Sequence, residues 1–155
     1  MSIINVIIPA YNEADSIVNV IKDIPQIVNE VIVVNNNSTD KSVNTAAGFC
    51  EEDHRFVLLD EQKQGVVHAH NRGIKSARGK YIARMDADDI SLPRRFEKQI
   101  NYLDSHTETG ILGTWANVID IHGNQTNALC FPVSSVLIEW SLIFKNCIVD
   151  RKSVV

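Results

Sequence analysis

Three carboxylates stand within four residues at Asp86, Asp88 and Asp89, directly after the apolar run from Tyr81 to Met85. Crowded carboxylates repel one another, so such a group usually lies at the surface or beside a cation. Mg²⁺ and Mn²⁺ prefer oxygen ligands and often take only one or two carboxylates, with a diphosphate and water as the other ligands. Asp86 and Asp88 supply that minimum. The alternative interpretation is an acidic turn that starts a helix.

Apolar runs alternate with helical patterns over most of the chain. Strands covered on both faces are predicted at residues 3–8, 30–34, 56–59 and 81–85. Apolar residues at helical spacing predict four helices. The first spans 17–24, the second follows a cap at Ser38 or Thr39, the third spans 65–78, and the fourth starts at Ser91. Strands that alternate with helices in this way predict βαβ units and an α/β fold with a mainly parallel sheet.

Right-handed crossovers place all strand-to-helix loops at one edge of such a sheet, where open α/β sheets bind ligands. The polar loops at 9–13, 35–40 and 86–89 therefore define the expected site. Within the first loop, Pro9 is expected to end the strand.

The last part of the chain has a different pattern. Residues 111–121 predict one long strand, residues 122–125 a turn, and residues 128–131 a partner strand. Ser134 or Ser135 is expected to cap a short helix, whose apolar face would hold Leu137, Trp140 and Phe144. The sequence stops at 151–155 without a terminating signal, which predicts a domain that is incomplete at its C-terminus.

Composition narrows the class of protein. A chain of 155 residues fits one domain with a real core, and a net charge of −4 gives no basis for nucleic-acid binding. Three widely spaced cysteines without a CxxC pair argue against a disulfide framework or a zinc site and favour a reducing compartment. The short apolar start lacks the basic region and the length of a signal peptide or membrane span, so a cytoplasmic location is expected.

Three other ligand sites of α/β proteins fit this sequence less well, because the motifs that they require are absent or lie elsewhere in the chain. A dinucleotide site needs GxGxxG after the first strand and a P-loop needs GxxxxGK[ST], and the sequence contains neither. A response-regulator pocket would have acidic residues after the first strand, whereas here they follow the fourth. A nucleoside diphosphate held through a divalent cation fits the Asp86-x-Asp88 spacing better.

With these features the chain resembles the family 2 glycosyltransferases, an inverting family with the GT-A fold. The resemblance runs almost from end to end and rests on blocks in the family's order: Val6 to Glu13, Glu30 to Val34 with Asn37 to Asp40, Asn71 to Ile74 with Ala77 to Gly79, Tyr81 to Asp89, Pro93 to Leu103, and Gly110 to Asp120. It implies a Rossmann-like, mainly parallel sheet flanked by helices in a single domain of residues 1–155. Residues 1–109 would bind the nucleotide sugar, and 110–155 would begin the acceptor side.

The resemblance also implies roles for single residues. The pocket for base and ribose would be lined by Pro9, Ala10, Tyr11 and Glu13, and the nucleoside would be touched by Asn35 and Asn36. Asp86 and Asp88, with Ala87 between them, would hold the diphosphate through Mn²⁺ or Mg²⁺, with Asp88 preferred as the direct ligand. Counter-charges for the diphosphate could come from Arg72, Lys75 and Arg84. Alternatively, these three cations are surface residues or structural partners of the acids, and Tyr11 packs as a core aromatic.

Three departures from the family pattern bear on activity. The family usually carries aspartate at one or both of the positions of Asn35 and Asn36, and asparagine adds a donor there. His70 stands where the family often has arginine, and a packed or surface histidine is the expectation. The catalytic base is expected beyond Val155, because neither Asp120 nor Asp150 matches its position.

The expected function is therefore metal-assisted, inverting transfer of a sugar from a nucleoside-diphosphate sugar, with UDP preferred, to a saccharide or lipid-linked acceptor. Polysaccharide biosynthesis at the inner face of the membrane is the expected setting. A nucleotide-binding fragment or degenerate relative without turnover is the first alternative. A nucleotidyltransferase that makes sugar nucleotides ranks last, because such enzymes open with a glycine-rich loop and a basic signature.

Overall fold

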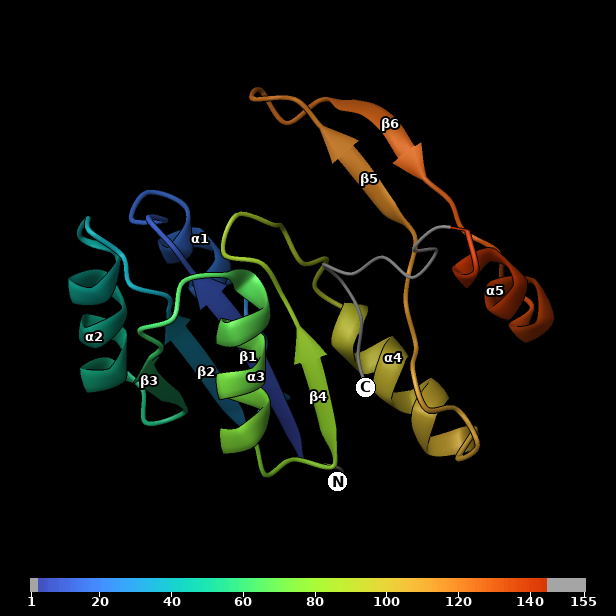
Figure 1. Ribbon diagram of the computed structural model, residues 1–155, viewed down its shortest axis with the longest axis horizontal. Helices are drawn as coiled ribbons and strands as arrows, with labels where there is room; N and C mark the ends of the chain where they lie inside the picture. The colour runs from blue at the N-terminus through green and yellow to red at the C-terminus, as the bar shows by residue number, and fades with distance from the viewer. Residues whose placement is uncertain (1–2, 145–155) are drawn as a thin grey trace.

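A parallel sheet of four strands forms the centre of the protein, which was analysed as a computed structural model that describes residues 3–144 (Figure 1). The strands are β1 (Ile4–Ala10), β2 (Glu30–Asn35), β3 (Phe56–Asp60) and β4 (Tyr81–Arg84), in the order β3-β2-β1-β4. The order reverses between β1 and β4, because β2 and β3 lie on the other side of β1. Ligands of open α/β sheets bind outside the carboxyl ends of the strands at such a reversal.

Helices cover both faces of this sheet. One face packs against α3 (Val66–Ser76), whose Ala69 joins a buried cluster with Ile7, Ile32 and Val34. The other face packs against α1 (Ile17–Lys22), α2 (Ser42–Glu52) and α4 (Arg95–Ser105), and Phe96 of α4 is fully buried there. On α3, a Cβ at Gly73 would lie 2.5 Å from Ile7 Cγ2. Glycine at this position therefore allows α3 to approach the sheet closely.

The predicted strands and helices of this part are present, but α1 ends at Lys22 and not at residue 24, and α4 begins at Arg95 and not at Ser91. Two further corrections concern β1 and α2. Strand β1 continues through Pro9 to Ala10, because the Asn36 backbone N–H donates to the Ala10 carbonyl at 2.9 Å and extends the pairing with β2. Neither Ser38 nor Thr39 caps α2, which begins at Ser42, two residues later than a cap at Thr39 and three later than a cap at Ser38 would require. Instead the Asp40 carboxylate accepts from the backbone N–H of Ser42 at 2.9 Å.

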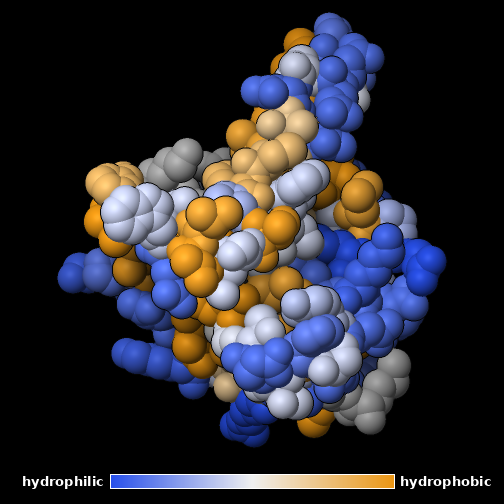
Figure 2. All heavy atoms as spheres, turned by 90° about the vertical axis from the view of Figure 1, so that its right-hand side faces the viewer, coloured by the Kyte–Doolittle hydropathy of each residue, from blue (hydrophilic) through white to orange (hydrophobic). Residues whose placement is uncertain are grey.

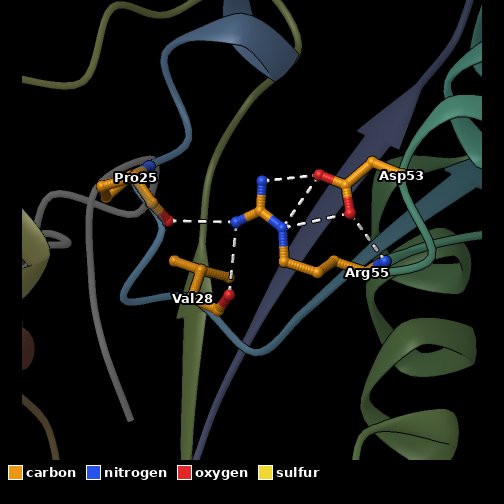
Figure 3. Close-up of polar contacts among 4 residues, drawn as sticks. All are labelled: Pro25, Val28, Asp53 and Arg55. Atoms are coloured by element: carbon orange, nitrogen blue, oxygen red, sulfur yellow. Dashed lines mark hydrogen bonds and ion pairs between the residues drawn. The ribbon is translucent and has the colours of Figure 1, made fainter.

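Arg55 joins three segments near the amino ends of the strands, opposite the expected site. Its guanidinium donates to the Pro25 carbonyl at 3.2 Å and the Val28 carbonyl at 3.3 Å, and it pairs with Asp53 at 2.8 Å (Figure 3). The Asp53 pKa is lowered mainly by the hydrogen bond from the Arg55 side chain. The connection before β2 is thus tied to the start of β3, which helps to fix the sheet.

Residues 111–144 form a hairpin and a helix, with strand bounds that differ from the prediction. The long strand is reduced to β5 (Ala116–Ile119), and its antiparallel partner is β6 (Gln125–Leu129), not 128–131. The carboxylate of Asp120 accepts from the backbone N–H groups of His122 and Asn124, at 2.8 and 2.9 Å. This carboxylate closes the turn earlier than predicted, so β6 starts earlier and β5 has a partner over only a few residues.

The expected apolar face of the last helix is present but not buried. Helix α5 (Ser135–Leu142) follows Ser134, which makes no side-chain cap, and none of its residues is buried. Leu137, Trp140 and Phe144 are 54%, 62% and 72% exposed. Figure 2 shows apolar side chains gathered on the side of the molecule that carries the hairpin and α5. No helix within residues 3–144 has the length and apolar character needed to cross a membrane.

Candidate active site

A cavity of about 320 Å³ lies at the carboxyl ends of β1, β2 and β4. It is lined by residues from four strand-to-helix loops, namely Pro9, Ala10, Tyr11, Glu13, Asn36, Gln64, Gly65, Val66, Asp86, Ala87 and Asp88. Eight of these are residues that the family resemblance had assigned to the site. The sheet therefore brings together side chains that are up to about eighty positions apart in sequence, at the point where the strand order reverses.

The acidic motif leaves β4 at the floor of this cavity. The Met85 backbone N–H donates to the Ile7 carbonyl at 3.1 Å, so β4 pairing continues to the residue before Asp86. Met85 and Ala87 are buried, whereas Asp88 is exposed. The Asp89 N–H donates to the Asp86 carbonyl at 3.4 Å, which bends the chain back into a turn. The motif thus presents Asp86 and Asp88 to the same cavity.

The donor set of this cavity fits a divalent cation only in part. Within residues 3–144 no group of three or more His, Cys, Asp or Glu side chains lies close enough together to bind a metal ion. Asp86 and Asp88 line the cavity together with Glu13, whose carboxylate accepts from the Ser16 hydroxyl at 2.5 Å. Hard cations that keep several non-protein ligands are bound by one or two carboxylates, with phosphate oxygens completing the shell. The residues present therefore fit Mg²⁺ or Mn²⁺ that arrives together with a diphosphate.

The β1–α1 loop is tied to the β2–α2 loop by hydrogen bonds across the top of the sheet. Asn12 adopts a left-handed conformation (φ 56°), and its side-chain oxygen accepts from the Thr39 N–H at 2.8 Å. The backbone N–H of Glu13 donates to the Ser42 hydroxyl at 2.8 Å, and that of Ala14 donates to Asp40 at 3.2 Å. These bonds fix the segment that carries Tyr11 and Glu13 into the cavity.

Asn35 and Asn36 are both buried, and their amides bond to the protein. Asn35 accepts from the Ser38 N–H at 3.0 Å and donates to Asp60 at 2.8 Å, and it does not line the cavity. Asn36 lines the cavity, while its amide bonds to residues 61–65. The expected contact with the nucleoside is thus geometrically open for Asn36 and not for Asn35.

The expected counter-charges lie elsewhere. Arg72 and Lys75 are exposed on α3, and Arg84 belongs to β4; none of the three lines the cavity. His70, in contrast, is 5% exposed and packs in the interior, which is one of the two placements expected for it.

Gln64, Gly65 and Val66 were missed by the sequence reasoning, although they line the cavity. The signal that could have found them was available. If all strand-to-helix loops lie at one edge, the loop after the third strand belongs to the site, and only the other three were considered. Gly65, with φ 129° directly before α3, marks the turn that brings this loop over the sheet.

A second cavity, of about 760 Å³, meets the first at Asp88. Its walls come from α4 with the preceding loop and from the hairpin, and include Arg95, Lys98 and Trp115. Burial lowers the pKa of Arg95 to about 10, while the charge of Asp89 acts in the opposite direction. The guanidinium therefore remains charged at neutral pH, close to the acidic motif.

Comparison with known proteins agrees with this fold. The family model described as glycosyl transferase family 2 matches residues 5–148. The chain belongs to that family.

Curated relatives are similar over most of this chain. It is 32% identical over 130 residues to the uncharacterized glycosyltransferase MJ1057 of Methanocaldococcus jannaschii, which covers 79% of this chain and 44% of that protein. It is 33% identical over 129 residues to the amylovoran biosynthesis glycosyltransferase AmsE of Erwinia amylovora, covering 79% and 48%. The chain thus spans less than half the length of these two relatives.

Solved structures confirm the GT-A type of α/β fold. The mannosyltransferase PcManGT from Pyrobaculum calidifontis, solved in complex with GDP-Man and Mn²⁺, matches 77% of this chain and 36% of that chain, with a TM-score of 0.63 and 26% identity. TarS from S. aureus matches 81% and 38%, with a TM-score of 0.65. At 20% identity the second likeness speaks for the fold alone.

Proposed function

We propose that this chain binds the nucleoside-diphosphate sugar for an inverting, metal-dependent glycosyltransferase that transfers the sugar to an acceptor hydroxyl. One observation carries the proposal: Asp86 and Asp88 line the same cavity as Tyr11 and Asn36, across the ends of three neighbouring strands. A nucleotide sugar has a diphosphate at its centre and a flat base at one end. Its site therefore needs charge near the middle and an aromatic or polar wall at the end that holds the base.

Each group of residues would contribute a separate part of the function. Asp86 and Asp88 would hold the diphosphate through Mg²⁺ or Mn²⁺, which would stabilise the charge on the departing nucleotide. Tyr11 is 46% exposed and would pack against the nucleoside, with Pro9, Ala10 and Glu13 beside it. The hydrogen bonds of Asn12 and Asp40 hold this wall in place before any ligand binds. Less conformational entropy is then lost when the ligand binds.

The acceptor would enter from the second cavity, which shares Asp88 with the first. Its wall combines apolar side chains such as Trp115 with the cations of α4, which suits a saccharide or a lipid-linked acceptor. The biosynthetic name of AmsE supports a role in polysaccharide assembly. A cytoplasmic site of action, at the inner face of the membrane, is part of the proposal.

Proton removal from the acceptor is assigned to no residue of this chain. Asp120 uses its carboxylate to hold the hairpin turn, and its pKa is lowered mainly by the backbone hydrogen bond from Asn124. A carboxylate stabilised in its ionised form by several donors is a weak base. Asp150 lies outside the described residues. The base is proposed to lie in a segment beyond Val155.

A binding function without turnover is the second candidate. It is favoured by Asn35, whose amide bonds to Ser38 and Asp60 and which does not reach the cavity. A labelled nucleotide sugar distinguishes the two candidates, because hydrolysis or transfer above background requires turnover. We expect very weak turnover by residues 1–155 and far stronger turnover by a longer chain with the downstream segment. Equal turnover by both would contradict a base beyond Val155.

Calorimetric titration of UDP and GDP, with and without Mn²⁺, tests donor binding. We expect binding that requires the metal and that is abolished by Asp88→Ala, because one carboxylate is then left to hold the cation. Glu108→Ala, an exposed acid outside both cavities, is the matched control and should bind like the unsubstituted chain. Equal binding by the Asp88→Ala variant would exclude a metal role for this residue.

A further inference from the structure

The cavity that Asp86 and Asp88 line, called the donor cavity from here on, has a direction that follows from the strand order. Asn36 follows β2, Asp86 follows β4, and β1 lies between these strands. A ligand whose diphosphate is held at Asp86 and Asp88 therefore extends across the end of β1 toward Asn36. The side chains next to Asn36 are those that a nucleobase would meet.

The amide of Asn36 is used to hold the loop of residues 61–65. Its Nδ2 donates to the Glu61 carbonyl at 3.3 Å and to the Lys63 carbonyl at 2.9 Å, and its Oδ1 accepts from the Gly65 N–H at 2.7 Å. Both amide protons are thereby engaged, and Asn36 is only 3% exposed. Aspartate could not make the same contacts, because a carboxylate has no proton to donate to two carbonyl oxygens.

Gln64 is carried by this loop into the cavity. It is exposed and lines the donor cavity, and its side-chain amide makes no hydrogen bond in the part of the chain that the structure describes. Lys63 and Gly65, on either side of Gln64, are held in place because the Lys63 carbonyl and the Gly65 N–H both bond to the Asn36 side chain. The backbone of Gln64 is thus held, while its amide is available to a ligand.

We propose that Gln64 is the specificity-determining residue that contacts the nucleobase of the donor, and that Asn36 positions Gln64 by holding residues 61–65. The inference rests on the proposed function, since it takes the ligand to be a nucleoside diphosphate. It also assigns Asn36 a role through the loop and not through direct contact with the ligand.

The chemistry of an amide defines the edge that it reads. Gln64 can accept from a ring N–H and donate to the neighbouring carbonyl, an edge that uracil presents at N3 and O4 and guanine at N1 and O6. A carboxylate at this position would accept only. It would repel the uracil carbonyl, but it would match the two adjacent donors of guanine, at N1 and N2.

Titrations of UDP and GDP with Mn²⁺, carried out on Gln64 variants, test whether this side chain contacts the base. Gln64→Ala should weaken both nucleotides by about tenfold, the effect of one or two hydrogen bonds. Gln64→Glu should weaken UDP and spare or strengthen GDP, which changes the ratio of the two dissociation constants by about tenfold or more. An unchanged ratio in Gln64→Glu, or unchanged affinity in Gln64→Ala, would overturn the assignment of Gln64.

A double-mutant cycle tests the positioning role of Asn36. Asn36→Asp should weaken UDP and GDP by similar factors, because it releases the loop. In a Gln64→Ala background, the same substitution should have little further effect on affinity, since it acts through Gln64. Full additivity would overturn the positioning role. Should Asn36→Asp fail to fold, Asn36→Ser, which keeps one donor and an acceptor, replaces it in the cycle.

The outcomes also distinguish this inference from the proposed function. If the unsubstituted chain binds neither UDP nor GDP with Mn²⁺, the proposed function itself is contradicted. If it binds either nucleotide and the Gln64 variants bind in the same way, the proposed function stands and the inference about Gln64 is wrong.

Discussion

Residues 4–105 and residues 111–144 differ in how they are held together. In residues 4–105 every strand is paired, helices cover both faces of the sheet, and Ile4, Val6 and Phe96 are fully buried. In residues 111–144 the hairpin strands pair only with each other, and α5 buries none of its residues. Residues 4–105 are therefore specified by their own core, whereas the hairpin and α5 present much of their apolar surface to solvent.

The largest difference between the two regions is expected in stability. Phe96→Ala should lower the free energy of unfolding by about 3–5 kcal/mol, because it removes a buried aromatic ring and leaves a cavity. Trp140→Ala removes a larger aromatic side chain from α5, but this residue is 62% exposed, so the expected change is within about 0.5 kcal/mol. Urea unfolding of both variants measures the contrast. A similar loss in the two would show that α5 contributes to the same core.

A smaller difference is expected between two carboxylates that both hold turns. Asp40 accepts from Ala14 and Ser42 and joins the loops of the donor cavity, while Asp120 accepts from His122 and Asn124 within the hairpin. Asp40→Asn should weaken UDP binding several-fold, since an amide nitrogen cannot accept from the Ala14 N–H. Asp120→Asn should leave UDP affinity unchanged. A loss of the same size in both variants would mean that the hairpin also shapes the donor cavity.

Asp40 also gives a pH dependence of defined sign. Hydrogen bonding, from the Ser42 side chain first, lowers the pKa of Asp40 from the usual 3.8. A lowered folded-state pKa stabilises the fold at pH values above 3.8, and this contribution is lost as the pH falls through the folded-state pKa. Denaturant unfolding at neutral pH and below pH 3.8 should show a smaller acid loss in Asp40→Asn than in the unsubstituted chain.

Much of the parallel sheet and of the cavity at its edge could be predicted, because the sequence patterns that indicate them are local. Apolar runs gave the four strands of the parallel sheet, and the rule that strand-to-helix loops share one edge brought Tyr11, Asn36 and Asp88 together in advance. The rule did not extend to Gln64, because the loop after the third strand was left out of the site. The engaged amide of Asn36 could not be foreseen, since its partners at 61–65 are set by tertiary structure.

The hairpin was harder to predict for a physical reason. The run from Ile111 to Ile121 has strand composition throughout, but a strand extends only as far as its partner, and that partner is set by the turn at Asp120. Similarly, the apolar face of α5 predicts burial, yet burial depends on a surface to pack against. The family resemblance offered Arg72 and Lys75 as possible counter-charges, but a motif does not reveal which side of α3 a residue occupies.

Binding of Mn²⁺ to the chain alone and to the chain with UDP or GDP tests the central claim most directly. Water-proton relaxation measures the bound metal in each case. Within residues 3–144 no three His, Cys, Asp or Glu side chains are grouped to hold a metal ion, so we expect weak binding of Mn²⁺ alone. In the presence of the nucleoside diphosphate we expect at least tenfold tighter binding, on the order of 1.4 kcal/mol. Mn²⁺ affinity that is independent of both nucleotides would contradict a shared metal and diphosphate site at Asp86 and Asp88.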